Sequence, residues 1–198
     1  IDQDFASLLN KLGTVRLWQK DFAGAETSHR RALTIYRKTR GADDLRVADT
    51  LDLVAVALFE QPHGHELAGS LFFRAWAIRE TALGQNHPDV ADSLHHLALS
   101  LYSDNVSFAI PLLLRSKEIR EKVFGHDHPS VADSLHAMAR LYEAHSRRDL
   151  AIPLYQQALT IQEKVFGPNA LETKQVHNNL DMAHQEMDHA VEDSRPPD

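Results

Sequence analysis

The chain has 198 residues, of which 43% are hydrophobic and 25% are charged, as in ordinary globular proteins, and it contains no cysteine. The missing cysteine excludes disulfides, thiolate nucleophiles and cysteine zinc sites, and it is compatible with a reducing, cytoplasmic compartment. The formal net charge is −7, with +4 on residues 1–42 and −11 on the remainder; this acidic body argues against nucleic acid, and no apolar run approaches the roughly 20 residues that cross a membrane.

Two helices are predicted before Gly41, which is the first of four glycines that recur along the chain. In the first helix, Leu9 and Gly13 lie about one turn apart on one face. In the second helix, Ala25 and Ala32 lie seven residues apart, and small side chains at this spacing let a neighbouring helix approach closely. The second helix also carries a basic run, which we interpret as a solvated face rather than as a contact for an acidic surface: Arg30, Arg31, Arg37, Lys38 and Arg40.

The following segments repeat this pair of helices. Val-Ala-Asp-Thr-Leu-Asp at 47–52 returns as Val-Ala-Asp-Ser-Leu-His at 90–95 and again at 131–136, at offsets of 43 and 41 residues. Repetition at this period indicates a stack of helix-turn-helix units rather than one closed core. The boundaries repeat as well: glycine ends each second helix and proline is expected in the first turn of the next helix, at Gly41, Gly84, Gly125, Gly167, Pro88, Pro129 and Pro168.

Four such units and a final capping helix predict an all-α fold of about nine helices, and no strand pattern appears. We expect one domain over 1–189, with repeats at about 4–41, 44–84, 87–125 and 128–167, a capping helix at 170–189 and a disordered tail at 190–198. The sequence begins inside a helical pattern and without an initiator methionine, so we expect it to be a piece of a longer protein.

These features resemble a known family. The large-x-x-large-small pattern, the His-Pro-Asp/Ser-Val-Ala entrance, the Ala-Ile-Pro-Leu segment and the Val-Phe-Gly exit are similar to long tetratricopeptide repeats of the kinesin-light-chain type. The resemblance implies a right-handed α-solenoid superhelix whose first helices line a concave groove. It also implies that the groove holds an extended or helical segment of a protein partner, and it implies no catalysis.

Helical phase places the predicted groove residues opposite the hairpin core of each first helix. They are Asn10, Thr14, Asp49, Asp52, Asp92, His95, Leu99, Asp133, His136, Arg140 and Asn178. Related arrays carry asparagine at the central groove position, because a carboxamide can donate to and accept from a peptide backbone at once; here only Asn10 and Asn178 match. The aspartates would make the central groove negative, so we expect a neutral or basic partner segment. Alternatively, Asp92 and Asp133 serve to favour the helix dipole.

Other candidate chemistry is poorly supported. No glycine-rich phosphate loop or Gly-x-Ser-x-Gly occurs, so we expect no enzyme activity and no cofactor. The thirteen histidines form no His-Glu-x-x-His pattern, so we expect no metal site. His95 and His136, if paired across neighbouring repeats, would make ligand binding pH-sensitive. The large aromatic residues are predicted to be packing residues: Trp18, Trp76, Phe72 and Phe73.

The sequence therefore predicts a non-catalytic protein-interaction module with a scaffold or adaptor role in the cytoplasm, with no nucleic-acid or membrane partner. Two alternatives remain open. The end repeats could drive self-association into a homo-oligomer, or the chain could be a ligand-sensing regulatory domain of a larger signalling protein.

Overall fold

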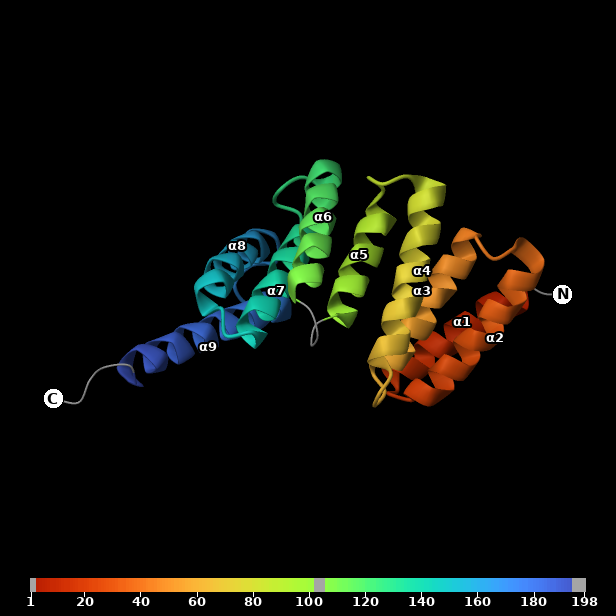
Figure 1. Cartoon of the computed structure of the whole chain (residues 1–198), viewed down its shortest axis with the longest axis horizontal. Helices are drawn as coiled ribbons and strands as arrows, with labels where there is room; N and C mark the ends of the chain where they lie inside the picture. The colour runs from red at the N-terminus through yellow and green to blue at the C-terminus, as the bar shows by residue number, and fades with distance from the viewer. Residues whose placement is uncertain (1–2, 102–105, 194–198) are drawn as a thin grey trace. The chain divides into compact units, whose positions relative to one another are not determined.

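The computed structural model describes residues 3–101 and 106–193, and within these ranges it contains nine α-helices and no β-strand (Figure 1). The expected all-α class is confirmed. The helices are α1 (Gln3–Trp18), α2 (Phe22–Arg40), α3 (Leu45–Phe59), α4 (His65–Leu83), α5 (Pro88–Ser100), α6 (Val106–Phe124), α7 (Pro129–Ala144), α8 (Arg148–Phe166) and α9 (Leu171–Asp193).

The chain divides into two compact units. Unit 1 comprises residues 1–101 with α1 to α5, and unit 2 comprises residues 102–198 with α6 to α9. The division falls between α5 and α6, inside the repeat expected over 87–125. The single domain expected over 1–189 stays a prediction.

In unit 1 each helix packs against the next one along the chain. The central helix, α3, lies between α2 and α4 and buries residues on two adjoining faces. Val47, Leu51 and Val54 are among its fully buried side chains, each 0% exposed. Burying an aliphatic side chain of this size contributes roughly 1.5–3 kcal/mol, so this double-sided burial stabilises the stack.

Unit 2 is built in the same way, with α7 between α6 and α8, and α9 against α8. Leu113 on α6, Leu141 on α7 and Tyr155 on α8 are each 0% exposed. The apolar stripe of each helix thus meets another helix rather than a common centre, as in a repeat array.

The helix ends follow the predicted signals in most places. The second helices of the hairpins end at glycines with φ between 82° and 95°, a backbone conformation that favours glycine: Gly41, Gly84, Gly125 and Gly167. The side chains of His87 and His128 cap α5 and α7, each followed by the predicted proline. Pro168 is different: α9 begins only at Leu171, so the prediction of proline in its first turn is wrong.

The C-terminal boundary also differs from the expected one. Helix α9 continues to Asp193, four residues beyond the end expected for the capping helix, and the disordered tail expected over 190–198 stays a prediction. Residues 194–198 lie outside the described residues.

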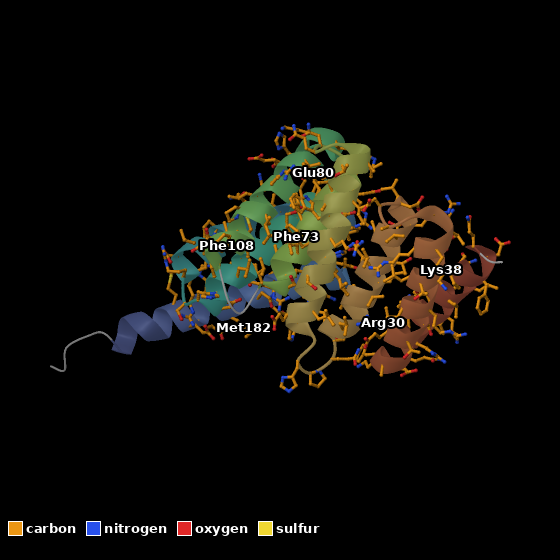
Figure 2. The ribbon with its side chains drawn as sticks, turned by 45° about the vertical axis from the view of Figure 1, so that its right-hand side comes forward. Arg30, Lys38, Phe73, Glu80, Phe108 and Met182 are labelled. Atoms are coloured by element: carbon orange, nitrogen blue, oxygen red, sulfur yellow. The ribbon has the colours of Figure 1, made fainter. Side chains whose placement is uncertain are left out.

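The large aromatic residues are not all packing residues. Phe72 is buried and Trp76 is half-buried, as predicted, but Trp18 is 80% and Phe73 is 55% exposed. Trp18 is the last residue of α1, and Phe73 faces outward from α4 (Figure 2). Trp18 and Phe73 are therefore not buried packing residues, although the ring of Phe73 contacts that of Trp76, with the centroids 5.3 Å apart.

The basic run of α2 lies on a solvent-facing side of unit 1. Arg30 and Lys38 project from the surface (Figure 2), and Arg30 pairs with Glu26 one turn away, at 2.7 Å between Nε and Oε1. This agrees with the interpretation of the run as a solvated helix face.

Candidate partner-binding site

A polar hollow of about 580 Å³ lies in unit 1, between α1 and α3. Three predicted groove residues, Asn10, Thr14 and Asp49, line it together. Sequence reasoning did not select the exposed Trp18, nor the two basic side chains. The full lining is Ser7, Asn10, Lys11, Thr14, Val15, Trp18, Tyr36, Arg46, Asp49 and Thr50.

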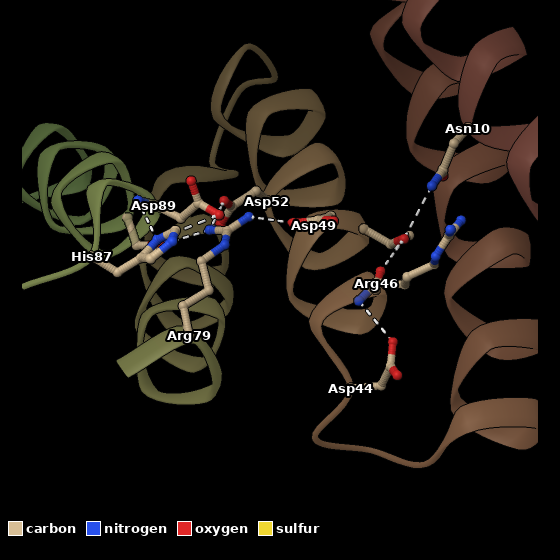
Figure 3. Close-up of polar contacts among 10 residues, drawn as sticks. Asn10, Asp44, Arg46, Asp49, Asp52, Arg79, His87 and Asp89 are labelled. Atoms are coloured by element: carbon tan, nitrogen blue, oxygen red, sulfur yellow. Dashed lines mark hydrogen bonds and ion pairs between the residues drawn. The ribbon is translucent and has the colours of Figure 1, made fainter. Parts of the chain in front are cut away.

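The carboxamide of Asn10 is held by a chain of hydrogen bonds through three helices. Its Nδ2 donates to Oγ1 of Thr50 at 3.0 Å, and the Thr50 hydroxyl donates to the Arg46 carbonyl at 2.7 Å (Figure 3). The Asn10 oxygen must then be the acceptor in its 3.1 Å contact with Nδ1 of His29. The carboxamide keeps one N–H and one lone pair for a partner.

These hydrogen bonds determine which nitrogen of the His29 ring carries the proton. Because Nδ1 donates to Asn10, the neutral ring carries its proton on Nδ1, and Nε2 is buried without a hydrogen-bond partner among the described residues. Burial lowers the pKa of His29 to about 4, since no negative group compensates a charge there. His29 thus acts as a neutral positioning residue for Asn10.

A buried arginine joins α3, α4 and α5. Arg79 is 7% exposed; it donates to the Asp52 carboxylate, to Oγ of Ser93 at 2.5 Å and to Oδ1 of Asp49 at 2.8 Å (Figure 3). Burial raises the pKa of Asp52, and the charge of Arg79 acts in the opposite direction. Sequence reasoning missed Arg79, although it occupies the buried position that Tyr36 has in the preceding second helix.

Two expectations change as a result. Asp52 is only 9% exposed and is bound to Arg79, so it is a structural residue and not an open groove contact as predicted. The Asp49 side chain remains 61% exposed. Since Arg79 carries one positive charge against the two carboxylates, this part of the surface is less negative than the sequence indicated.

A second, apolar hollow of about 190 Å³ lies in unit 1 between α3, α4 and α5. The predicted groove residue Leu99 belongs to it, while Asp92 and His95 lie nearby on α5, exposed and half-buried respectively. The ring of Phe72 forms one wall, with its centroid 5.4 Å from that of His96. The lining residues are Val56, Phe59, Glu60, Phe72, His96 and Leu99.

In unit 2 the predicted residues of α7 are Asp133 and Arg140, both exposed, and His136, which is half-buried. Nε2 of His136 accepts from Nδ2 of Asn179 on α9 at 2.8 Å. Burial, with the charge of Arg140 as a second cause, lowers the pKa of His136 to about 4. The predicted Asn178 is exposed; its neighbour Asn179 makes the contact, because adjacent helical residues point about 100° apart.

The predicted site residues therefore fall into two groups, one in each unit. His95 belongs to unit 1 and His136 to unit 2, and their pairing stays a prediction. Over residues 3–101 and 106–193, no group of three histidine, aspartate or glutamate side chains is placed to hold a metal ion. No helix in this part of the chain has the length and apolar character needed to span a bilayer.

Comparison with known proteins identifies the family of the chain and structures with a similar fold. Residues 4–72 and 102–164 match the model of a family described as tetratricopeptide repeat. A putative kinesin light chain from Podosopora anserina with nearly identical TPR-like repeats shares 23% identity over 94% of this chain and 88% of that chain, with a TM-score of 0.78. BtubC (BKLC) from P. vanneervenii shares 18% identity over 96% of this chain and 82% of that chain, with a TM-score of 0.77.

A third similar structure is the apo form of RapI, at 17% identity over 98% of this chain and 74% of that chain, with a TM-score of 0.73. At these identities the similarity to solved structures concerns the fold. No curated protein sequence gives a significant match.

Proposed function

Because the chain belongs to the tetratricopeptide repeat family, we propose that it is a non-catalytic scaffold whose first helices bind an extended segment of a protein partner. The polar hollow between α1 and α3 is the observation that carries this proposal. It combines hydrogen-bonding side chains with Trp18, which is 80% exposed. Tryptophan is enriched among the residues that dominate the energy of protein interfaces.

The polar groups of this hollow are suited to a peptide backbone. The bonds from Asn10 to His29 and Thr50 hold the carboxamide in place before any partner arrives, which reduces the entropy lost on binding. The remaining N–H and lone pair can pair with a backbone C=O and N–H. The Thr14 hydroxyl donates to the Asn10 carbonyl at 3.1 Å, so its oxygen remains an acceptor.

The apolar hollow supports a side-chain preference. It is large enough for one aliphatic or aromatic side chain and is lined mainly by apolar groups. Thr50 borders the polar hollow and Val56 borders the apolar one; these residues lie about 9 Å apart along α3. An extended segment that follows α3 therefore spans about three residues from its contact beside Thr50 to its apolar anchor beside Val56.

The charges favour a neutral segment. Lys11 and Arg46 line the polar hollow together with Asp49, and Arg79 compensates part of the charge of Asp49 and Asp52. Neither a strongly basic nor a strongly acidic segment would meet a complementary surface in either hollow. A cytoplasmic setting belongs to the same proposal, supported by the cysteine-free sequence.

The test is selection of a phage library of random peptides on the full chain. We expect the enriched peptides to share one large apolar residue and to bind at least about tenfold more weakly to the Trp18→Ala variant. Replacing Leu99 by alanine should relax the selection for the large apolar residue, because it enlarges the apolar hollow.

Phe73→Ala is the matched control, since Phe73 is an exposed aromatic residue of unit 1 outside both hollows. It should leave peptide affinity unchanged. Enriched peptides that bind the Trp18→Ala variant as tightly as the unaltered chain would contradict the proposal. If light scattering instead shows a homo-oligomer, and the Trp18→Ala substitution dissociates it, this surface serves self-association.

A further inference from the structure

Basic side chains cover the outward face of α2, and α4 contributes one more. Arg30 and Lys38 project from this face (Figure 2). Arg30 and Arg37 are two helical turns apart, which places them on one side of α2 with about 10 Å between them along the axis. The basic patch consists of exposed residues only: Arg30, Arg31, Arg37, Lys38 and Arg74.

Positive charge exceeds negative charge in this patch. Burial, followed by the charges of Arg74 and Arg30, lowers the pKa of Arg37. Of the patch residues only Arg30 has an ion-pair partner among the described residues, namely Glu26. The Asp43 carboxylate also lies beside the patch, in a hollow of about 370 Å³ along α4 that is lined by Asp43, Arg74, Ala77, Ile78, Thr81 and Ala82. The patch residues therefore repel one another more than the nearby carboxylates compensate.

The later hairpins carry the opposite charge at the position of Arg37. Counted back from the glycine that ends each second helix, the aligned residues are Glu80, Glu121 and Glu163. The Glu121 carboxylate pairs with Nζ of Lys117 at 2.7 Å, so its charge is balanced within its own helix. An arginine at this position, beside Arg74, is a change of sign that the stability of the fold does not favour.

This outward face stays open in every hairpin of the described chain. The residues of α4, α6 and α8 that align with Arg30, Arg31, Arg37 and Lys38 are all exposed or half-buried: Phe73, Arg74, Glu80 and Thr81; Leu114, Arg115, Glu121 and Lys122; and Gln156, Gln157, Glu163 and Lys164. A neighbouring repeat therefore does not cover this face. Solvation accounts for the exposure of the patch, but it does not account for the sign of Arg37.

The charge distribution of the chain limits what can bind there. The residues after position 42 carry a formal charge of −11, so a nucleic acid or an anionic membrane that extends beyond the patch would be repelled. None of the exposed large apolar side chains belongs to α2, so this helix has none to insert into a bilayer. A short acidic segment can contact the patch alone.

We propose that the basic patch on α2 and α4 binds an extended acidic segment of a partner protein. Carboxylates about three residues apart in such a segment match the spacing of Arg30 and Arg37, since an extended chain rises about 3.3 Å per residue. A carboxylate that accepts from Arg37 and Arg74 relieves their repulsion, and arginine suits it because its donors can pair with both oxygens. No residue of the patch lines either hollow of the proposed peptide groove, so the two sites are separate.

The test is fluorescence anisotropy of a labelled peptide with glutamate at every third position, separated by glycine and serine, added to the full chain. Binding should be saturable at an ionic strength of about 0.05 M and at least about tenfold weaker at about 0.5 M, because salt screens exposed charges. Arg37→Glu installs the residue of the later hairpins and should weaken binding at least about tenfold. The same variant should have an unchanged or higher thermal midpoint, because glutamate would lie beside Arg74.

Lys122→Glu is the matched control, since it makes the same change of net charge at an exposed position near the end of α6. It should leave binding of the glutamate peptide unchanged. Trp18→Ala should do so too, which separates this site from the peptide groove.

Absence of saturable binding overturns the proposal, as does equal binding of a peptide with glutamine in place of glutamate. Full affinity or a lower thermal midpoint in Arg37→Glu also contradicts it. Capture of the chain by phosphatidylserine vesicles that Arg37→Glu abolishes would assign the patch to a membrane instead. A dimer in light scattering that Arg37→Glu dissociates would assign it to a second copy, and either result overturns the proposal.

Discussion

Gly13 on α1 and His29 on α2 are packed so closely that a methyl group at Gly13 would lie 2.4 Å from Cε1 of His29. His29 is fully buried, at the position that Phe72, Leu113 and Tyr155 occupy in the later hairpins. The first hairpin thus places a neutral histidine where the others have a large apolar residue, and it accommodates the ring by having no side chain at Gly13.

Gly13→Ala should destabilise unit 1 by about 1–3 kcal/mol, although alanine is the better helix former, because the enclosed His29 ring cannot move away. Urea unfolding followed by circular dichroism measures this loss. Gly69→Ala is the control: its new methyl would meet the side chain of Ser100, with Oγ at 3.1 Å and Cβ at 3.6 Å, and should change stability much less. If both variants lose the same free energy, the steric explanation fails.

Arg79→Met should lower the free energy of unfolding by roughly 3–5 kcal/mol, because it leaves the buried Asp52 carboxylate without its positive partner. Asp49→Asn should cost less than about 1 kcal/mol, since that carboxylate is largely exposed. Adding Asp52→Asn to Arg79→Met should recover part of the loss. Denaturant titration of the three variants decides this, and a double variant no more stable than Arg79→Met would contradict the ion-pair account.

Stability should fall as the pH is lowered from about 6.5 towards 4. The pKa of His29 is lowered from 6.5 to about 4 in the folded chain, so the unfolded chain binds a proton that the folded chain excludes. For this group the loss reaches up to about 3 kcal/mol. The measurement is the difference in unfolding free energy between pH 7 and pH 4.5, which should shrink in His29→Gln. His63→Gln, which changes an exposed histidine, is the control and should leave the difference unchanged.

Asn179→Ala should loosen α9 by about 1 kcal/mol, because Nε2 of His136 loses its donor. Hydrogen exchange of the α9 amides measures the change locally. Asn178→Ala, one residue away and exposed, is the matched control and should leave the exchange rates as they are. Faster exchange in the Asn178 variant than in the Asn179 variant would contradict this role of Asn179.

Local signals explain why the helices could be located from the sequence. A glycine with positive φ at Gly125 and a proline directly after the His128 cap act through their own backbone, whatever surrounds them. Pro168 shows the limit of this reasoning. A proline follows the helix-ending glycine there as well, but helix α9 begins three residues after it, at Leu171.

Residue identity and repeat spacing by themselves determined the all-α class, the hairpin order and the membership of a repeat family, because helix periodicity and end signals act over a few residues. Only the tertiary structure decided which side chains are covered. Trp18 is exposed, Asp52 is bound to Arg79, and Asn179 contacts His136. The last two contacts join residues 27 and 43 positions apart in the chain, and packing and desolvation by such distant neighbours cannot be read from one helix alone.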